Sequence, residues 1–243
     1  MWSRPRNLSP LRNLLRFDRI AGAMTRAYFF GSGPATALPG GLYAFLKTQA
    51  QSEVPDIELI FRGAPPDAGM WFPGLKRPYR DGFGLRPCLL HPKSRGRLLL
   101  QNKDAFAPPR INLNCLADPV DSRTLRDGIA IARDLAASSR LDCFRGEELT
   151  PGIKVSSPAE IDRWIRTTAT TTQHPAGTCK MGTDSAAVVD PELRVHGIEG
   201  LRVVDASIMP DLISGHLNAA VIMIAERASD LIMRKAVSSS LTV

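Results

Sequence analysis

The chain has 243 residues, of which 44% are hydrophobic and 23% are charged. This balance excludes wholesale disorder, and a chain of this length can bury a sizeable core without a disulfide or metal staple. The net charge of +7 is concentrated at one end, because residues 1–26 hold six arginines and one aspartate. The rest of the chain is close to neutral, only 6% of the residues are aromatic and no nucleic-acid reader motif occurs, so we expect no nucleic-acid partner.

The N-terminal residues predict a helix. Leu8, Leu11, Leu14 and Leu15 have the spacing of an amphipathic helix that lies on a protein surface. A transit peptide is the alternative interpretation, since the stretch is rich in arginine and serine and poor in acids. Residues 31–41 follow as a loop rich in glycine and proline.

The next segment predicts a helix, a strand and a long loop. The helix is expected over residues 42–48, and the strand over residues 56–62, where apolar and polar residues nearly alternate. Residues 63–87 contain five prolines and five glycines, which indicates an extended surface loop or lid.

The middle of the chain predicts two more strands and two helices. The strands are expected over residues 97–101 and 110–116. Apolar residues recur with helical spacing over residues 121–138. The sequence Ser-Pro-Ala-Glu at 157–160 is a capping box with proline at the first helical position, so a further helix begins there.

The last third predicts a strand, a turn and a long helix. The strand covers residues 201–205, and the helix runs from residue 217 to near residue 234. Runs of strands followed by helices indicate an α+β fold with a substantial antiparallel sheet.

Cysteine usage and missing motifs narrow the function. The four cysteines form no C-x-x-C pair, which favours free thiols in a reducing, cytoplasmic compartment. No apolar run is long enough to cross a membrane, so no transmembrane segment is expected. The sequence has no G-x-G-x-x-G, P-loop, G-x-S-x-G or H-E-x-x-H motif. We therefore expect no metal site and no ordinary dinucleotide cradle built by this chain alone.

Two of the four histidines lie in glycine-flanked turns. His174 belongs to T-Q-H-P-A-G-T-C-K-M-G, and His216 belongs to S-G-H-L-N at the expected start of the long helix. A lone histidine is more often a structural residue, but two in such settings make a catalytic pair an equal alternative. His91, in H-P-K-S-R-G, is expected to hold a sheet turn, and His196 to lie in an exposed turn.

These motifs, taken in order, resemble the glucose–methanol–choline (GMC) flavin oxidoreductases. The resemblance extends over roughly residues 35–235 and is nearest to the bacterial choline and alcohol dehydrogenase-like branch. It rests on segments that follow one another as in the family, which are residues 91–96, 109–116, 174–182, 188–210 and 214–226.

The resemblance implies a fold class and four regions. The fold is α+β, with an antiparallel-sheet substrate domain, flanking helices and a C-terminal strand and helix that belong to a Rossmann-like FAD-binding domain. Residues 1–34 are a basic helical segment, and residues 35–172 are the substrate-binding domain. Residues 173–235 carry the C-terminal signature with the histidine pair, and residues 236–243 are a disordered tail.

The resemblance also implies the chemistry, which is oxidation of a CH–OH donor by hydride transfer to FAD. A histidine titrating near neutrality is a suitable acceptor for the hydroxyl proton. We expect His174 to be this base and His216 to orient the oxygen, although two close histidines titrate as a coupled pair and their roles can be exchanged. The cofactor contacts implied by the resemblance are Asp205, Ala206, Gly215 and Asn218. A turn-forming acid is the alternative interpretation of Asp205.

The sequence departs from the family in one respect, because the N-terminal nucleotide-binding half is missing. We therefore expect an incomplete FAD site and a fragment that is inactive alone, with a small alcohol as substrate and the missing half as a possible partner chain. The alternative is a non-catalytic remnant or a substrate-domain binding or structural module. Which alcohol is oxidised, and which acceptor reoxidises the flavin, stay open.

Overall fold

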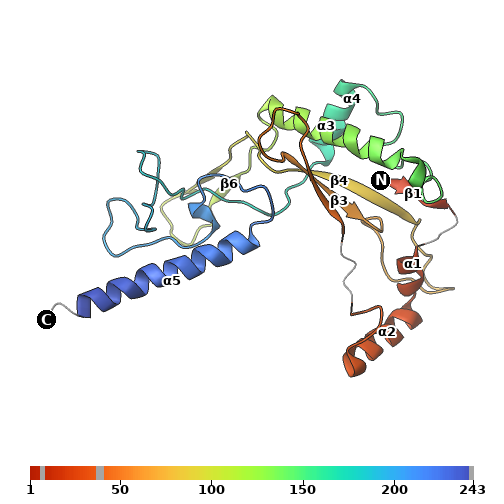
Figure 1. Ribbon diagram of the computed structural model, residues 1–243, viewed down its shortest axis with the longest axis horizontal. Coiled ribbons are helices and arrows are strands. Elements are labelled where there is room, and N and C mark those ends of the chain that lie inside the picture. The colour runs from red at the N-terminus through yellow and green to blue at the C-terminus, as the bar shows by residue number, and fades with distance from the viewer. Residues whose placement is uncertain (6–8, 37–40, 241–243) are drawn as a thin grey trace. The chain divides into compact units, whose positions relative to one another are not determined.

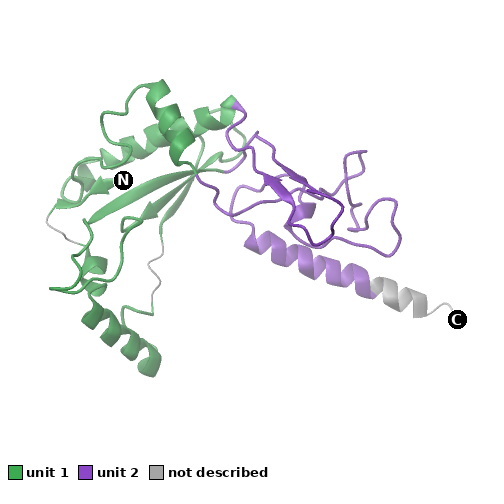
Figure 2. Cartoon of the chain, turned by 180° about the vertical axis from the view of Figure 1, so that it is seen from behind, with its two compact units in different colours: residues 1–89, 119–169 green, residues 90–118, 170–243 purple. Residues whose placement is uncertain are grey.

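The computed structural model describes residues 1–5, 9–36 and 41–240. The chain forms two compact units, which Figure 2 shows in different colours. Unit 1 comprises residues 1–89 and 119–169, and unit 2 comprises residues 90–118 and 170–243. The chain thus leaves unit 1 at residue 90, returns to it at residue 119 and leaves it again at residue 170.

Unit 1 is built on a four-stranded antiparallel sheet in the order β1-β4-β3-β2 (Figure 1). The strands are β1 (Trp2–Ser3), β2 (Tyr43–Leu46), β3 (Ile57–Arg62) and β4 (Gly82–Leu89). Tyr43 pairs with Ile60, and Ile57 pairs with Leu89. The antiparallel sheet expected from the sequence is confirmed.

Two expectations in this region are wrong. The helix expected over residues 42–48 is absent; Tyr43–Leu46 form strand β2 there, because pairing with β3 outweighs the local pattern. The end of the expected loop over residues 63–87 is strand β4. A Cβ on Gly82 would lie 2.6 Å from the carbonyl oxygen of Trp2, so this glycine permits the close approach of β1. Pro87 lies beyond the part of β4 that pairs with β1, where a missing N–H costs little.

Helices α3 (Pro119–Ala136) and α4 (Pro158–Thr168) complete the core of unit 1. Helix α3 packs on β3 and β4, and α4 packs on α3. A Cβ on Gly128 would lie 3.0 Å from Ile57 and 3.1 Å from Pro87, so this glycine lets α3 approach the sheet. The core cluster of this unit consists of Trp2, Leu59, Phe83, Ala132 and Ala136.

The N-terminal helices are α1 (Pro10–Leu14) and α2 (Phe17–Phe30). Trp71 joins them to the rest of unit 1, because its backbone exchanges hydrogen bonds with Leu15 and Phe17 and its indole N–H donates to the carbonyl oxygen of Arg12 at 2.8 Å. Leu8, which belonged to the expected helix, lies outside the described residues. A 3₁₀ turn, η2 (Ser139–Leu141), follows α3.

Unit 2 contains a two-stranded antiparallel sheet, a 3₁₀ turn and one long helix. These elements are β5 (Arg97–Leu99), β6 (Arg110–Asn112), η3 (Ala206–Ile208) and α5 (Asn218–Ser240). The core cluster of this unit consists of Val189, Leu193, Ile208, Met209, Leu217, Ile224 and Ala228.

Two features of unit 2 differ from expectation. Residues 201–205 form no strand; the backbone makes an isolated bridge between Arg202 and Arg194, and the N–H of Val203 donates to Leu193. Helix α5 continues to Ser240, into the segment expected to be disordered, since no glycine or proline interrupts it. Residues 241–243 lie outside the described residues. In the part of the chain that the structure describes, no helix is long and apolar enough to cross a membrane.

Candidate active site

The segment that carries His174 is held by a backbone ladder within unit 2. The N–H groups of Gly177, Cys179 and Met181 donate to the carbonyl oxygens of Ala206, Ser207 and Ile208 at 3.3, 2.9 and 2.7 Å. Because Ile208 is 1% exposed, the ladder ties this segment to the core of the unit. Gly177 has a φ of 83°, a conformation that favours glycine, and a Cβ there would lie 3.2 Å from the carbonyl oxygen of Met209.

The turn at residues 190–194 is held by the side chain of Asp190. The carboxylate of Asp190 accepts hydrogen bonds from the backbone N–H groups of Glu192 and Arg194 and from the Arg194 guanidinium. Burial raises the pKa of this carboxyl group, but these donors outweigh burial and hold the pKa of Asp190 below its ordinary value. The turn places Val189 and Leu193 in the core of the unit.

The two histidines of the turn motifs meet in the folded chain. His174 Nε2 and His216 Nδ1 lie 2.8 Å apart, within hydrogen-bond distance. The ring centroids are 4.9 Å apart and the ring planes are inclined by 67°. His174 is half-buried and His216 is exposed. One nitrogen of this pair donates and the other accepts, so the bond cannot persist when both rings are imidazolium ions.

His216 is fixed by the start of helix α5. The next residue, Leu217, is 4% exposed and belongs to the core cluster, and its carbonyl oxygen accepts from the N–H of Val221. On the other side, the N–H of Gly215 donates to the carbonyl oxygen of Ile213 at 2.8 Å. His216 therefore stands between a tight turn and a buried helix start, which limits its range of positions.

His91 contacts the same turn. Its Nε2 lies 2.8 Å from Ser214 Oγ, two residues before His216. Arg95 adds a second link, because its guanidinium lies 3.2 Å from the carboxylate of Asp211. This contact agrees with the expectation that His91 is structural. The sequence did not predict, however, that His91 would contact the turn that carries His216. The sequence marks Ser214 by the glycine that follows it, but this does not specify a partner 123 residues away.

The expected cofactor residues all belong to unit 2, where Ala206 is half-buried against the core cluster. The carboxylate of Asp205 accepts from the N–H of Ser207 at 2.7 Å and caps η3, as a turn-forming acid does. Ala206 uses its carbonyl oxygen in the ladder described above, and Asn218 is the first residue of α5. Asp205 and Asn218 are exposed.

The other histidine, His196, is peripheral. It is exposed, and its Nε2 lies 3.2 Å from the carbonyl oxygen of Gly182. Among the described residues, no three histidine, cysteine, aspartate or glutamate side chains lie close enough to hold a metal ion.

Comparison with curated proteins gives a consistent set of relatives. A profile described as GMC oxidoreductase matches residues 92–225, more than half of the chain. The oxygen-dependent choline dehydrogenase of Pseudomonas aeruginosa (strain LESB58) is 41% identical over 204 residues, which cover 84% of this chain and 36% of the relative. The oxygen-dependent choline dehydrogenase of Ectopseudomonas mendocina (strain ymp) is 39% identical over 230 residues, which cover 95% of this chain and 40% of the relative.

Solved structures agree with these relatives. A formate oxidase variant from Aspergillus oryzae, studied for modification of its FAD, has a TM-score of 0.83 at 25% identity and covers 96% of this chain and 45% of that one. Pyridoxine 4-oxidase from Mesorbium loti has a TM-score of 0.64 at 32% identity, over 77% of this chain and 36% of that one.

The chain spans between 36% and 40% of the length of the two curated relatives. FAD is the cofactor of the family, and so short a span holds only part of the site for it. The mixed α/β structure with its antiparallel sheet has the fold of these enzymes. The chain belongs to the GMC oxidoreductase family.

Proposed function

We propose that this chain supplies the substrate domain and the catalytic histidine pair of an FAD-dependent oxidoreductase that acts on CH–OH donors. The observation that carries the proposal is the 2.8 Å approach of His174 Nε2 to His216 Nδ1, made by two turns that lie far apart in the sequence. Such a pair combines a proton acceptor with a hydrogen-bond donor, which are the two groups that oxidation of an alcohol requires.

The direction of the hydrogen bond between the rings decides which ring accepts the proton. When His174 Nε2 donates to His216 Nδ1, the lone pair of His174 is on Nδ1 and the hydrogen of His216 is on Nε2. In this arrangement His174 accepts the hydroxyl proton and His216 donates a hydrogen bond to the alkoxide oxygen. The opposite tautomer exchanges the two roles, so the pair and not one ring is the catalytic unit.

We assign Asp205, Ala206, Gly215 and Asn218 to contacts with one side of FAD. Asp205 and Asn218 are exposed, and the first turn of α5 contains no acidic residue that would repel a reduced, negatively charged ring system. FAD, when bound, supplies the acceptor for the hydride that leaves the alcohol carbon, and the substrate becomes a carbonyl compound.

The remainder of the FAD site lies outside this sequence in our proposal. We assign residues 35–172 to the substrate-binding domain and residues 173–235 to the C-terminal signature, whose last helix belongs to a Rossmann-like FAD-binding domain. Residues 1–34 form the basic helical segment. We infer that the chain is inactive alone and active once an FAD-binding part is supplied, as a separate chain or within a longer one. A cytoplasmic location is proposed from the four free cysteines.

The relatives suggest which alcohol to test first. Both curated relatives described above are choline dehydrogenases, so choline is the first candidate, followed by aliphatic and aromatic alcohols. The chain is co-expressed with the FAD-binding part of a choline dehydrogenase, and dye-linked oxidation of each alcohol is measured. We expect activity only when both parts are present.

Paired histidine variants test the assignment. His174→Ala and His216→Ala are expected to lower kcat by about 10²–10⁴-fold, the usual contribution of a positioned acid or base. His196→Ala, which changes a histidine in an exposed turn, is the matched control and should retain activity. If the complemented wild type oxidises no alcohol, the chain is a non-catalytic remnant; if His174→Ala is fully active, the pair is not the catalytic unit.

A further inference from the structure

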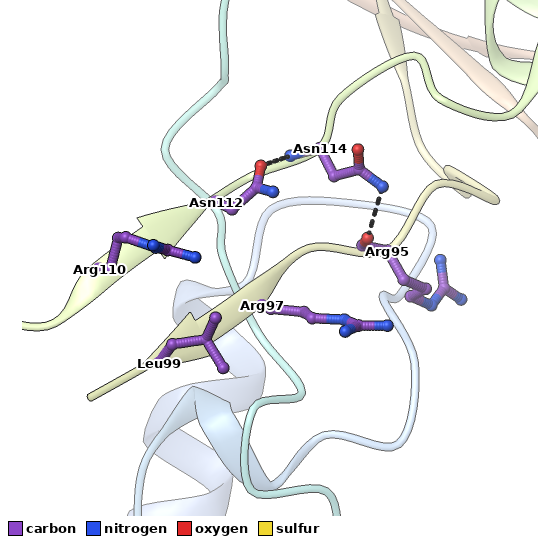
Figure 3. Close-up of a pocket in the computed structure, with 6 residues that line it drawn as sticks. All are labelled: Arg95, Arg97, Leu99, Arg110, Asn112 and Asn114. Carbon is purple, nitrogen blue, oxygen red and sulfur yellow. Dashed lines mark hydrogen bonds between the residues drawn. The ribbon is translucent and has the colours of Figure 1, made fainter. Parts of the chain in front are cut away.

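A second polar cluster lies on the two-stranded sheet of unit 2. Strands β5 and β6 carry a hollow of about 310 Å³, which Figure 3 shows with its lining side chains. The hollow is lined by Arg95, Arg97, Leu99, Arg110, Asn112 and Asn114. Three guanidinium groups and two carboxamides face this hollow, and no acidic residue lines it.

The strand register explains why these side chains gather. Arg97 pairs with Asn112 and Leu99 pairs with Arg110, so the four residues share one face of the sheet. Leu98 and Ile111, which pair with each other, occupy the opposite face and are 51% and 66% exposed. The hairpin is therefore two-sided, with a basic polar face and an apolar face. Residues on both faces are exposed.

The three arginines differ in their partners. Arg95 is neutralised, because its guanidinium lies 3.2 Å from the carboxylate of Asp211 and also donates to the carbonyl oxygens of Pro92 and Ser94. Arg97 and Arg110 form no ion pair with any carboxylate in residues 1–5, 9–36 or 41–240. The hollow thus carries two uncompensated positive charges on neighbouring strands.

The asparagines are held in place and add donors. Asn112 Oδ1 accepts from the N–H of Asn114 at 3.0 Å, which leaves its amide NH₂ group as the donor end of the side chain. Asn114 Nδ2 donates to the carbonyl oxygen of Arg95 at 3.0 Å, so the strand ends beside the hollow are tied together (Figure 3).

We propose that this hollow binds a small phosphate compound, either inorganic phosphate or a phosphate monoester. A phosphate monoester carries about −1.5 to −2 charges at pH 7, which matches the two unpaired guanidinium groups, whereas a carboxylate would leave one of them uncompensated. Guanidinium forks bind phosphate oxygens in a bidentate way, and the Asn112 amide provides a further donor. The volume is at the lower end of ligand pockets, about 300–1,000 Å³, so a dinucleotide does not fit.

The site is separate from the histidine pair and does not depend on the proposed oxidoreductase function. The test uses the full 243-residue chain and inorganic phosphate as the probe, with binding followed by isothermal calorimetry and by shifts of backbone amide resonances. The Arg97→Gln/Arg110→Gln variant removes the two unpaired charges. The control, Lys103→Gln/Arg227→Gln, removes two exposed charges of the same unit that do not line the hollow.

We expect phosphate to bind saturably and its affinity to fall at least about tenfold in the Arg97/Arg110 variant, and by less than about twofold in the control. Arg97→Lys/Arg110→Lys keeps the charge but loses the forks, and it replaces the glutamine variant if that variant is unfolded by circular dichroism. The proposal is overturned if phosphate does not saturate the chain, if the arginine variants bind as tightly as wild type, or if acetate binds as tightly as phosphate. The last result would mean that the hollow takes a carboxylate, such as an acidic side chain.

Discussion

At the scale of single residues, Gly177 decides how closely the histidine segment approaches η3. Its φ of 83° costs an L-residue about 1–2 kcal/mol, and a Cβ would also press on the carbonyl oxygen of Met209 at 3.2 Å. Gly177→Ala should therefore destabilise unit 2 and displace His174. Gly197→Ala is the matched control, because Gly197 has a φ of 76° but no atom within 4 Å of the added Cβ. Thermal unfolding should show a larger loss for Gly177→Ala, and equal losses would mean that the contact with Met209 is irrelevant.

Single residues also show where prediction from the sequence ends. Glycine and proline around His174 and His216 mark both turns, and the family resemblance brings the two histidines together. The contact of His91 with Ser214 has no such marker, because it depends on tertiary packing across 123 residues. The sequence also does not reveal that Arg97 and Arg110 form no ion pair among the described residues, because this depends on the strand register and on where acidic side chains lie in the fold.

At the scale of elements, the start of helix α4 makes stability depend on pH. Glu160 accepts from the backbone N–H and the hydroxyl of Ser157 and from the N–H of Ser156, and these donors hold its pKa below the ordinary value of 4.5. A lowered pKa in the folded state stabilises the fold above the ordinary value, and the gain is lost as the pH falls through the lowered pKa. Glu160→Gln should therefore have a lower Tm than wild type at neutral pH, and the difference should vanish in acid. Glu53→Gln is the control, because Glu53 is exposed and no donor to its carboxylate is found among the described residues. An undiminished Tm difference in acid would contradict the assignment.

Elements with their own boundary signals were predictable. The capping box at 157–160 specifies the start of α4, and the period of apolar residues specifies α3 to within two residues at each end. Residues 42–48 and 201–205 were assigned wrongly because their local pattern does not decide their state. The first segment gains a strand partner in β3, and the second meets only an isolated bridge. Strand β4 was hidden because its two glycines and its proline resemble loop composition in the sequence, whereas Gly82 in fact permits the close approach of β1.

At the scale of the whole molecule, large apolar side chains lie exposed in both units. Tyr28 and Phe30 of helix α2 are 84% and 77% exposed, and Leu100 and Phe106 of the β5–β6 connection are 89% and 96% exposed. Exposed apolar patches mark surfaces that bind other protein, and the chain spans only 36% of the length of its relative from Pseudomonas aeruginosa. We expect the chain alone to bind the dye ANS and to self-associate with increasing concentration, because nothing in the described residues covers these side chains.

Substitutions can show which of these surfaces is responsible. Leu100→Ser/Phe106→Ser and Phe29→Ser/Phe30→Ser each replace two exposed apolar residues, and Gln51→Ser is the control at an exposed polar position. Sedimentation velocity should show less association for both double variants and no change for the control. Addition of the FAD-binding part should lower ANS binding by the wild type, since a partner that covers these side chains removes the apolar surface to which the dye binds. If the wild-type chain stays monomeric and does not raise ANS fluorescence, these side chains are ordinary solvated surface. Complementation would then rely on polar contacts instead.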